Sequence, residues 1–200
     1  IIKVDNRFVA EGTETPMIPR VGLRMRLSEI LNDLTYYGRG PEENYRDRRT
    51  SQFIGEYTTP IKDLYEPYIR PQENEHRTDI YWCALTTKQK AGLLFIADRT
   101  FELNASNYLL GSLDSGETID NGAPRTNETN HRHLTDPQPV KQVDMFIDYR
   151  MMGVGGDNSW GAIAHEPYLI RPGVENAIEY GFSIVPFDKK ADYKNLIYQY

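Results

Sequence analysis

The sequence contains a single cysteine, Cys83, so it cannot form an intrachain disulfide or a metal site built on cysteine ligands. It has no apolar run of about 20 residues, the length that an α-helix needs to cross a bilayer. Lysine and arginine are not gathered into a stripe, and the net charge is −6. Because nucleic-acid binding requires clustered basic residues, we expect neither nucleic acid nor a membrane as a partner.

Short motifs that mark several enzyme classes are also missing. The sequence has no Gly-x-Ser-x-Gly, no Walker pattern and no histidine at a plausible spacing from Cys83. His131 and His133 lie on one side of an extended segment, but no third metal ligand is near, so a structural histidine pair is favoured over a metal site. The 29 acidic residues offer many carboxylate pairs. A glycosidase pair needs a defined separation that a sequence does not show.

The residues that are plentiful favour short strands joined by turns. Aromatic residues make up 12% of the chain, which has 14 Tyr, 12 Pro and 15 Gly. Strict alternation of apolar and polar residues predicts a half-buried strand over 21–27 and a second strand over 143–151 that leads into a glycine-rich stretch. Two apolar runs, 77–85 and 91–97, flank a polar turn and predict a hairpin. We therefore expect an all-β fold with antiparallel strands.

The remaining segments complete this expectation. A single domain over 1–200 is predicted from the length, with a leading segment 1–20 that contains a strand and then an extended stretch. A charged tail over 188–200 has a weak pattern and is expected to fray. A strand over 34–37 is expected to end at the glycines and the proline of 38–41, and the stretch 57–71 is expected to be irregular. A short helix over 104–113, a surface loop over 114–130 and a last strand over 177–187 should follow.

A glycine-rich stretch, Gly153-Val154-Gly155-Gly156-Asp157-Asn158-Ser159-Trp160, joins one predicted strand to a polar segment. Three glycines in four residues allow φ > 0, so we predict a tight loop that orients Trp160. Such a tryptophan either plugs a core or offers a stacking surface to a flat partner such as a sugar ring. The local sequence favours the plug, because most tryptophan surface is buried in folded proteins. A phosphate cradle is disfavoured, since no helix follows.

Four blocks resemble, in order, the C-terminal domain of family 2 β-galactosidases, the large bacterial lactose hydrolases. They are residues 37–48 (YGRGPEENYRDR), 65–74 (YEPYIRPQEN), 130–133 (NHRH) and 152–160 (MGVGGDNSW). The first block, taken alone, is a charged loop with a solvated or ion-paired face. Glu75-His76 departs from the family, whose members usually have a glycine beside a small polar residue there. The stretch 110–130 is expanded relative to the family.

The resemblance implies an antiparallel β-supersandwich related to galactose mutarotase-like domains. It also implies that the chain is part of a larger enzyme that hydrolyses β-galactosides such as lactose. The catalytic glutamates, with the magnesium and sodium ligands, would lie in an upstream TIM barrel. No catalytic residue, metal or cofactor is then expected in this segment, which alone should be inactive. The implied partners are a β-galactoside, that barrel and further copies of the enzyme in a homo-oligomer. The implied location is cytoplasmic, or periplasmic if a signal peptide precedes the sequence.

Within the family, the tryptophan of the Gly-Gly-Asp-x-Ser-Trp loop stacks on the sugar. The resemblance therefore implies substrate-binding roles for Trp160, Asp157 and Ser159, which reverses the local interpretation and predicts an exposed indole. The other blocks are assigned to structure, including Pro41, Tyr45, Asp47, Arg48, His131 and His133.

Two other functions stay open at this point. A free-standing carbohydrate-binding module would need a groove of exposed aromatic residues, for which Tyr36, Tyr37, Tyr45 and Tyr68 are candidates. An aldose epimerase would need a histidine and a carboxylate that converge. His165-Glu166 is the adjacent pair of those types, but neighbours in an extended chain point to opposite faces, so this hypothesis ranks last.

Overall fold

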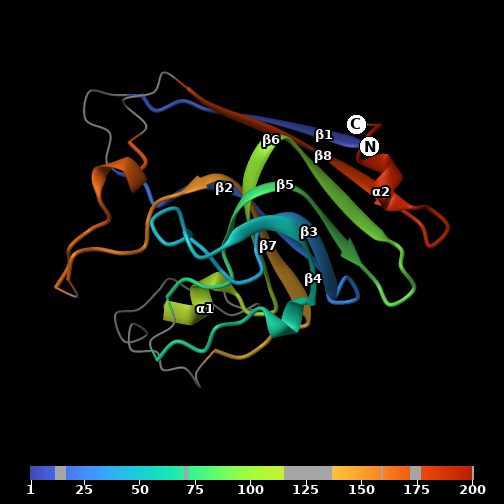
Figure 1. Ribbon diagram of the computed structural model, residues 1–200, viewed down its shortest axis with the longest axis horizontal. Helices are drawn as coiled ribbons and strands as arrows, with labels where there is room; N and C mark the ends of the chain where they lie inside the picture. Colours follow the sequence, from blue (N-terminus) through green and yellow to red (C-terminus); the bar gives the residue numbers. More distant parts are fainter. Residues whose placement is uncertain (12–16, 70–71, 115–136, 159, 172–176, 200) are drawn as a thin grey trace.

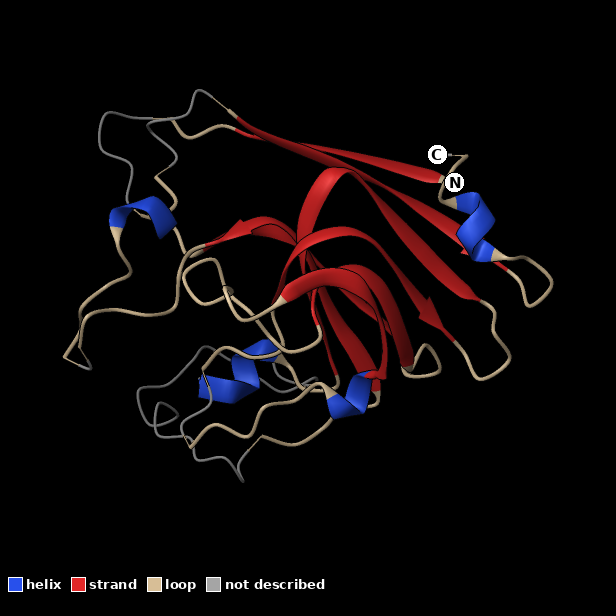
Figure 2. Ribbon diagram, viewed as in Figure 1, coloured by secondary structure: helices blue, strands red, loops and turns tan. Residues whose placement is uncertain are grey.

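The computed structural model describes residues 1–11, 17–69, 72–114, 137–158, 160–171 and 177–199. Within this part of the chain, eight strands pair antiparallel into one connected sheet with a few short helices (Figures 1 and 2), which confirms the predicted fold class. The neighbours run β1-β8-β6-β5-β3-β4, while β7 pairs with both β6 and β2. The strands are β1 (Ile2–Phe8), β2 (Arg20–Ser28), β3 (Asp33–Gly40), β4 (Phe53–Pro60), β5 (Arg77–Thr86), β6 (Gly92–Ser106), β7 (Gln142–Met151) and β8 (Ile178–Phe187).

Strand β6 organises the sheet because it changes its partner along its length. Residues 92–97 pair with β8, whereas residues 102–106 pair with β7. Strand β5 follows β6 on the other side, with register shifts between Arg77 and Trp82 where β6 bends. As a result, β7 and β8 diverge from residues 98–101 of β6, and the sheet forks there (Figure 1).

The main hydrophobic core lies between the strands of this curved sheet. Alternate residues of the strands face it, as the period-two pattern predicts, and Phe101 and Phe182 meet edge to face with ring centroids 6.3 Å apart. Its buried members include Leu34, Tyr36, Ile61, Ile80, Cys83, Leu85, Phe95, Leu103, Val143, Met145 and Ile147. Burial raises the pKa of the Cys83 thiol, so Cys83 is an inert core residue.

The C-terminal tail is ordered over its described residues, so the prediction of fraying was wrong. Asp192 caps helix α2 (Tyr193–Leu196) by accepting a hydrogen bond from the Lys194 amide. Tyr193, Leu196 and Ile197 then cover a second core on the outer face of β5, β6 and β8. The Tyr193 ring centroid lies 5.1 Å from that of Phe187. Three apolar side chains within five residues were too short a pattern to reveal this helix in the sequence.

Other sequence expectations need smaller corrections. Strand β4 was not predicted, and its residues Tyr57–Pro60 belong to the stretch that was expected to be irregular. The sequence did not reveal this edge strand because Gly55 and Pro60 interrupt its alternating pattern. After it comes the 3₁₀-helix η1 (Ile61–Asp63). Strand β6 continues to Ser106, so the predicted helix is only α1 (Leu110–Asp114). The hairpin of β5 and β6 is confirmed. The expected loop over 114–130 lies beyond the described residues after position 114.

No helix in the described part of the chain is long and apolar enough to span a membrane.

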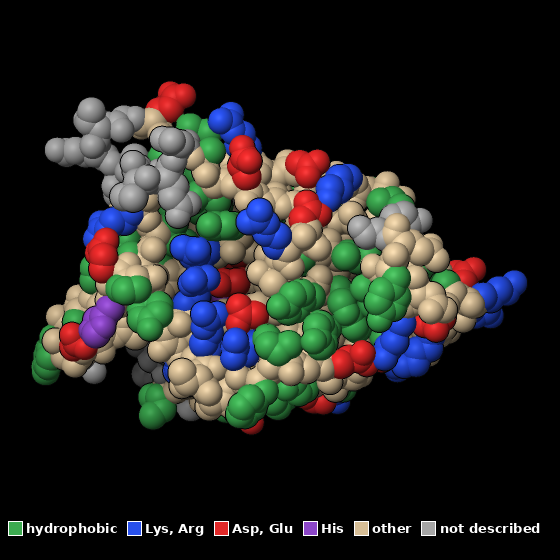
Figure 3. All heavy atoms as spheres, turned by 45° about the horizontal axis from the view of Figure 1, so that its top comes forward, with side chains coloured by type: hydrophobic (Ala, Val, Ile, Leu, Met, Phe, Trp, Pro, Cys, Tyr) green, Lys and Arg blue, Asp and Glu red, His purple; other side chains and the backbone are tan. Residues whose placement is uncertain are grey.

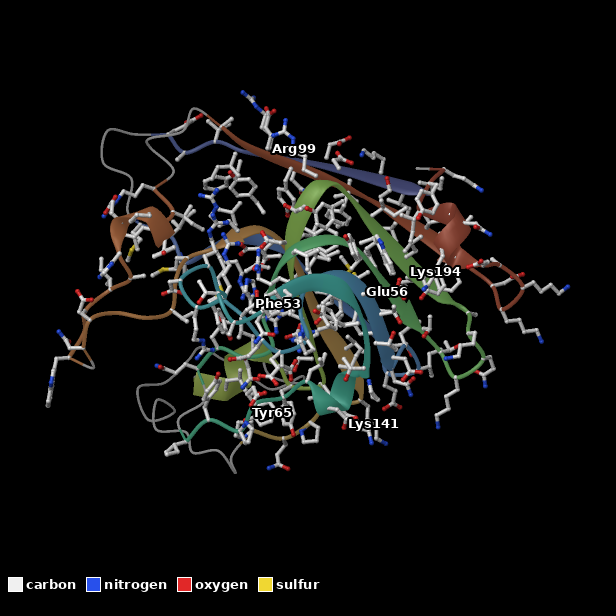
Figure 4. The ribbon with its side chains drawn as sticks, viewed as in Figure 1. Phe53, Glu56, Tyr65, Arg99, Lys141 and Lys194 are labelled. Carbon is white, nitrogen blue, oxygen red and sulfur yellow. The ribbon has the colours of Figure 1, made fainter. Side chains whose placement is uncertain are left out.

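Removal of a core side chain tests this packing. We expect Phe101→Ala to lower the free energy of unfolding by about 3–5 kcal/mol, because it leaves a cavity in the main core. Phe53→Ala is the matched control, since Phe53 is 71% exposed on the edge strand (labelled in Figure 4) and should change stability by about 0.5 kcal/mol or less. Denaturant unfolding measures both, and equal losses for the two variants would contradict this assignment of the core.

Candidate functional site

The glycine-rich stretch forms part of a long loop, residues 152–170, which follows β7 and extends away from the sheet (Figure 1). Two backbone hydrogen bonds close its stem, from Met152 N to Pro19 O at 2.9 Å and from Gly153 N to Tyr168 O at 2.8 Å. Near the far end, Trp160 is 93% exposed. The predicted exposure of this indole is confirmed, and the core-plug interpretation is wrong.

Space, rather than positive φ, explains the glycines at the start of this loop. Among the described glycines, φ is positive only at Gly161, at 93°. A Cβ on Gly153 would lie 2.6 Å from a carboxylate oxygen of Asp47, and one on Gly156 would lie 2.2 Å from the Ala162 carbonyl oxygen. Gly153, Gly155 and Gly156 thus do not use the freedom to adopt φ > 0 that the sequence allows. These positions need glycine because the loop packs closely against its anchors.

Asp47 anchors the start of the loop from a distant part of the sequence. Its carboxylate accepts hydrogen bonds from Gly155 N at 2.8 Å and from Val154 N at 3.2 Å. Hydrogen bonds from backbone amides to a carboxylate are charge-assisted and stronger than neutral ones. The predicted structural role of Asp47 is thus confirmed.

Local contacts shape the end of the loop that carries the indole. Asn158 Oδ1 accepts a hydrogen bond from Trp160 N at 2.8 Å, an Asx-type turn. Across the loop, Asp157 Oδ1 lies 2.8 Å from His165 Nε2, and both side chains are exposed. An exposed pair of this kind adds little stability, but it joins the two sides of the loop. Ser159 lies outside the described residues.

The first sequence block forms a hub that supports Asp47. Glu43, whose side chain is nearly buried, accepts hydrogen bonds from Arg48, from the Tyr68 hydroxyl and from Glu75 N, the last at 2.8 Å. Arg48 also lies over the rings of Tyr45 and Tyr68. Because these side chains bind one another, the structural roles predicted for Tyr45 and Arg48 are confirmed.

Pro41 contributes to this hub through its backbone. Its carbonyl oxygen accepts hydrogen bonds from the Tyr36 hydroxyl and from Arg77 Nη2, each at 3.1 Å. This agrees with its predicted structural role. His131 and His133, which were assigned to a strand end, lie outside the described residues.

Beneath the loop, Glu102 of β6 ties the end of β7 to the hub. It accepts a hydrogen bond from Met151 N at 2.6 Å, and its other oxygen lies 3.3 Å from Arg46 Nη1. The ring of His76 bridges Glu102 Oε2 at 3.1 Å and Asn104 Oδ1 at 2.8 Å, and it stacks on Tyr45. Burial on its own would lower the pKa of His76. The hydrogen bond to Glu102 and the negative charge of Glu102 outweigh burial, so the pKa of His76 is raised.

Two carboxylates, those of Glu75 and Asp148, are buried near this network. Burial raises the pKa of Glu75 to about 8, and it raises the pKa of Asp148 to about 7 although Arg20 Nε lies 3.2 Å away. Glu75 also has φ = 62°, a conformation that glycine adopts without strain. The sequence departure at Glu75-His76 thus places an ionisable side chain and a strained backbone in the interior.

The structure does not bring together the residues that the sequence suggested for the two other functions. Tyr36 and Tyr45 are fully buried, and the Tyr68 hydroxyl is bound to Glu43, so the four proposed tyrosines do not form an exposed groove. His165 and Glu166 do not converge, because His165 faces Asp157 while Glu166 is held by Arg171 in a two-point ion pair. That hydrogen bond lowers the pKa of Glu166, which disfavours it as an acid.

No group of three or more His, Cys, Asp or Glu residues among those described is placed to hold a metal ion. The magnesium and sodium sites implied for a whole enzyme stay a prediction about other parts of it.

Comparison with known families decides the relationship. The model of the family described as "Beta galactosidase small chain" matches residues 1–184. This chain belongs to that family. A β-galactosidase of Priestia megaterium is 33% identical over 162 residues, which are 81% of this chain and 14% of the relative. One of Vibrio cholerae is 32% identical over 158 residues, covering 79% and 13%. The chain therefore spans about one seventh of the length of these β-galactosidase relatives, and the resemblance to the C-terminal domain is confirmed.

Sequence reasoning found the exposed tryptophan in this small-chain domain but missed the anchors of its loop. Asp47 and Gly155 are 108 residues apart, and no local pattern connects them. Their proximity follows from the sheet, which brings the loop after β3 beside the end of β7.

Loss of the Asp47 anchor should loosen the loop. In Asp47→Ala, hydrogen exchange at the amides of Val154 and Gly155 should rise about tenfold, which corresponds to a loss of about 1.4 kcal/mol for two charge-assisted hydrogen bonds. Asp63→Ala, which removes an exposed aspartate from η1, should leave those amides unchanged. Unaltered exchange in Asp47→Ala would show that the stem alone holds the loop.

The buried carboxylates predict how stability depends on pH. The pKa values of Glu75, Asp148 and His76 are raised in the folded state. The stability that each group contributes is therefore fully present below its pKa in the unfolded chain, and it is lost as the pH rises through its pKa in the folded protein. The free energy of unfolding should fall between about pH 5 and pH 8, by on the order of 1 kcal/mol per pH unit for each titrating group.

A neutral variant isolates the part due to Glu75. Glu75→Gln should flatten the fall between about pH 5 and pH 8, whereas Glu29→Gln, at an exposed position, should keep it. Denaturant unfolding at several pH values measures both slopes. A stability that rises toward pH 8 in the parent chain would be the contrary result.

Proposed function

We propose that this chain is the C-terminal accessory domain of a β-galactosidase that hydrolyses terminal β-D-galactosides such as lactose. In this proposal the domain supplies a loop to the substrate pocket. The bond-breaking glutamates and the magnesium and sodium ions lie in a TIM barrel elsewhere in the enzyme. The segment alone is then inactive, because a retaining glycosidase needs two carboxyl groups about 5 Å apart across the scissile bond.

The observation that carries the proposal is the position of Trp160. Its indole is 93% exposed, yet the loop that bears it is closed at the stem and anchored by Asp47. An exposed tryptophan on an anchored loop presents a large apolar surface at little cost in conformational entropy. Such a surface is suited to another part of the enzyme and to a ligand held there.

The chemistry of the loop fits a sugar. The apolar face of a pyranose ring packs against an indole, while nearby polar groups bind its hydroxyls. We assign the polar role to Asp157 and Ser159. Asp157 is exposed and bound only to His165 among the described contacts, so it is accessible to a ligand hydroxyl.

The antiparallel sheet supports the finer fold assignment. We propose that these strands are part of a β-supersandwich of the galactose mutarotase-like type. The curved sheet with its core between the strands supports this assignment. In the intact enzyme the barrel would receive the Trp160 loop, and further copies would assemble into a homo-oligomer.

Truncation of the indole in the intact enzyme tests the proposal. Trp160→Ala should weaken binding of lactose by about 1–3 kcal/mol, the scale of one lost aromatic contact face. Cleavage of activated aryl galactosides should suffer less in its first chemical step, because the catalytic glutamates are untouched. Steady-state kinetics with both substrates gives the two effects.

Tyr198→Ala is the matched control, since Tyr198 is 90% exposed and follows α2, a helix at the opposite end of the molecule from the loop 152–170 (Figure 1). It should leave both substrates unaffected. An unchanged KM for lactose in Trp160→Ala, or an enzyme that unfolds, would refute the role of this residue.

A further inference from the structure

A groove of about 780 Å³ lies at the fork of the sheet, where β6 leaves β8 and joins β7. Its volume is in the range of sites that bind small organic ligands. It is lined by β1, β8, the bend of β6, the end of β7 and Arg46. Figure 3 shows Lys and Arg side chains gathered in a band on the face where β1 and β8 come forward, with acidic side chains among them. None of the described residues of the loop 152–170 lines the groove, so the groove is separate from Trp160.

The charges that line the groove are not balanced. Arg7 is paired with Glu179, Asp98 with Lys3, and Arg46 with Glu102. Arg99 and Arg150 have no ion pair among the described contacts. Asp5 is the one acidic residue of the described lining that also has no ion pair, so two unpaired positive charges face one unpaired negative charge. This positive surplus occurs in a chain whose net charge is −6.

Two arginines of the groove also have unused donors. The Nε atoms of Arg46 and Arg150 are buried and donate no hydrogen bond. Because a buried donor without an acceptor is unfavourable, the protein itself does not fully satisfy these two guanidinium groups. The Arg150 guanidinium lies over the Tyr149 ring, whose centroid is 6.2 Å from that of Tyr180. An anion bound here therefore has aromatic surface beside it.

The acids of the groove gather in another place. A Cβ on Gly181 would meet the carboxylates of both Asp98 and Asp5, at 2.4 and 2.9 Å, so these two side chains flank that glycine. Carboxylates accept hydrogen bonds from hydroxyl groups. One part of the groove thus offers arginine donors beside the rings of Tyr149 and Tyr180. Another part offers the carboxylates of Asp5 and Asp98, which accept hydrogen bonds from hydroxyl groups.

We propose that this groove binds an acidic sugar, a pyranose that carries a carboxylate or a sulfate. The guanidinium groups of Arg99 and Arg150 bind the anionic group through charge-assisted hydrogen bonds. Tyr149 and Tyr180 pack on the ring, and Asp5 and Asp98 accept from its hydroxyls. A simple anion would use only the arginines, and an uncharged sugar would leave them unpaired.

Calorimetric titration of the intact enzyme that contains this chain tests the proposal. The titrations contain excess galactose to occupy the substrate pocket, and the probes are digalacturonate and galactose 6-sulfate. Maltose is the uncharged sugar, because it is not a galactoside, and citrate is the anion without a ring. At least one acidic sugar should bind about tenfold more tightly than maltose or citrate, and higher salt should weaken it. Equal binding of maltose, or tighter binding of citrate, would overturn the proposal.

Three substitutions locate the site. Arg150→Gln should weaken the acidic sugar about tenfold, and Arg99→Gln, at an exposed position that folding does not need, should weaken it to a smaller extent. Lys141→Gln makes the same charge change on the opposite side of the molecule (Figure 4) and should have no effect. Unchanged binding in both arginine variants would refute the site. The KM for lactose should stay the same in all three, so this outcome is independent of the role of Trp160.

Discussion

The change of partner along β6 is the constraint on which the rest of this structure depends. One continuous strand pairs with β8 over its first residues and with β7 over its last, so two arms of the sheet diverge from a single bend. The fork between these arms is the charged groove. Just beyond the bend, Glu102 binds Met151 N, the last amide of β7 before the glycine loop. Both candidate binding surfaces are therefore placed by the same strand.

Polar contacts over long sequence distances then define the loop. Asp47 holds its first amides, and Glu43 and Glu102 hold the segments on which Asp47 depends. The network includes buried carboxylates that favour their protonated form, so it reduces stability at high pH. Costs of this kind are common at functional sites, where polar groups are kept for geometry and not for stability. Here they hold an exposed indole on an anchored base.

The sequence predicts the parts of this fold that depend on local pattern. Strands β2 and β7 alternate apolar and polar residues strictly and were found with nearly correct bounds, although the structure buries both faces of β7 over residues 143–148. Strand β4 was missed because its glycine and proline read as a turn, although β3 supplies its hydrogen bonds. At the loop, the exposure of Trp160 followed from the family resemblance, while the anchor Asp47 did not follow from any pattern. Its contact with Gly155 exists only after the sheet has formed, and the glycines fit that contact by their small size.

The central claim is that this loop delivers Trp160 to a sugar bound in another part of the enzyme. The most direct measurement is a crystal structure of the intact enzyme with galactose or lactose bound. The account predicts that the Trp160 ring lies in van der Waals contact with the sugar, at about 4 Å, and that Asp47 still binds the amides of Val154 and Gly155. A bound sugar with Trp160 remote from it, exposed to solvent or packed only on protein, would contradict the account.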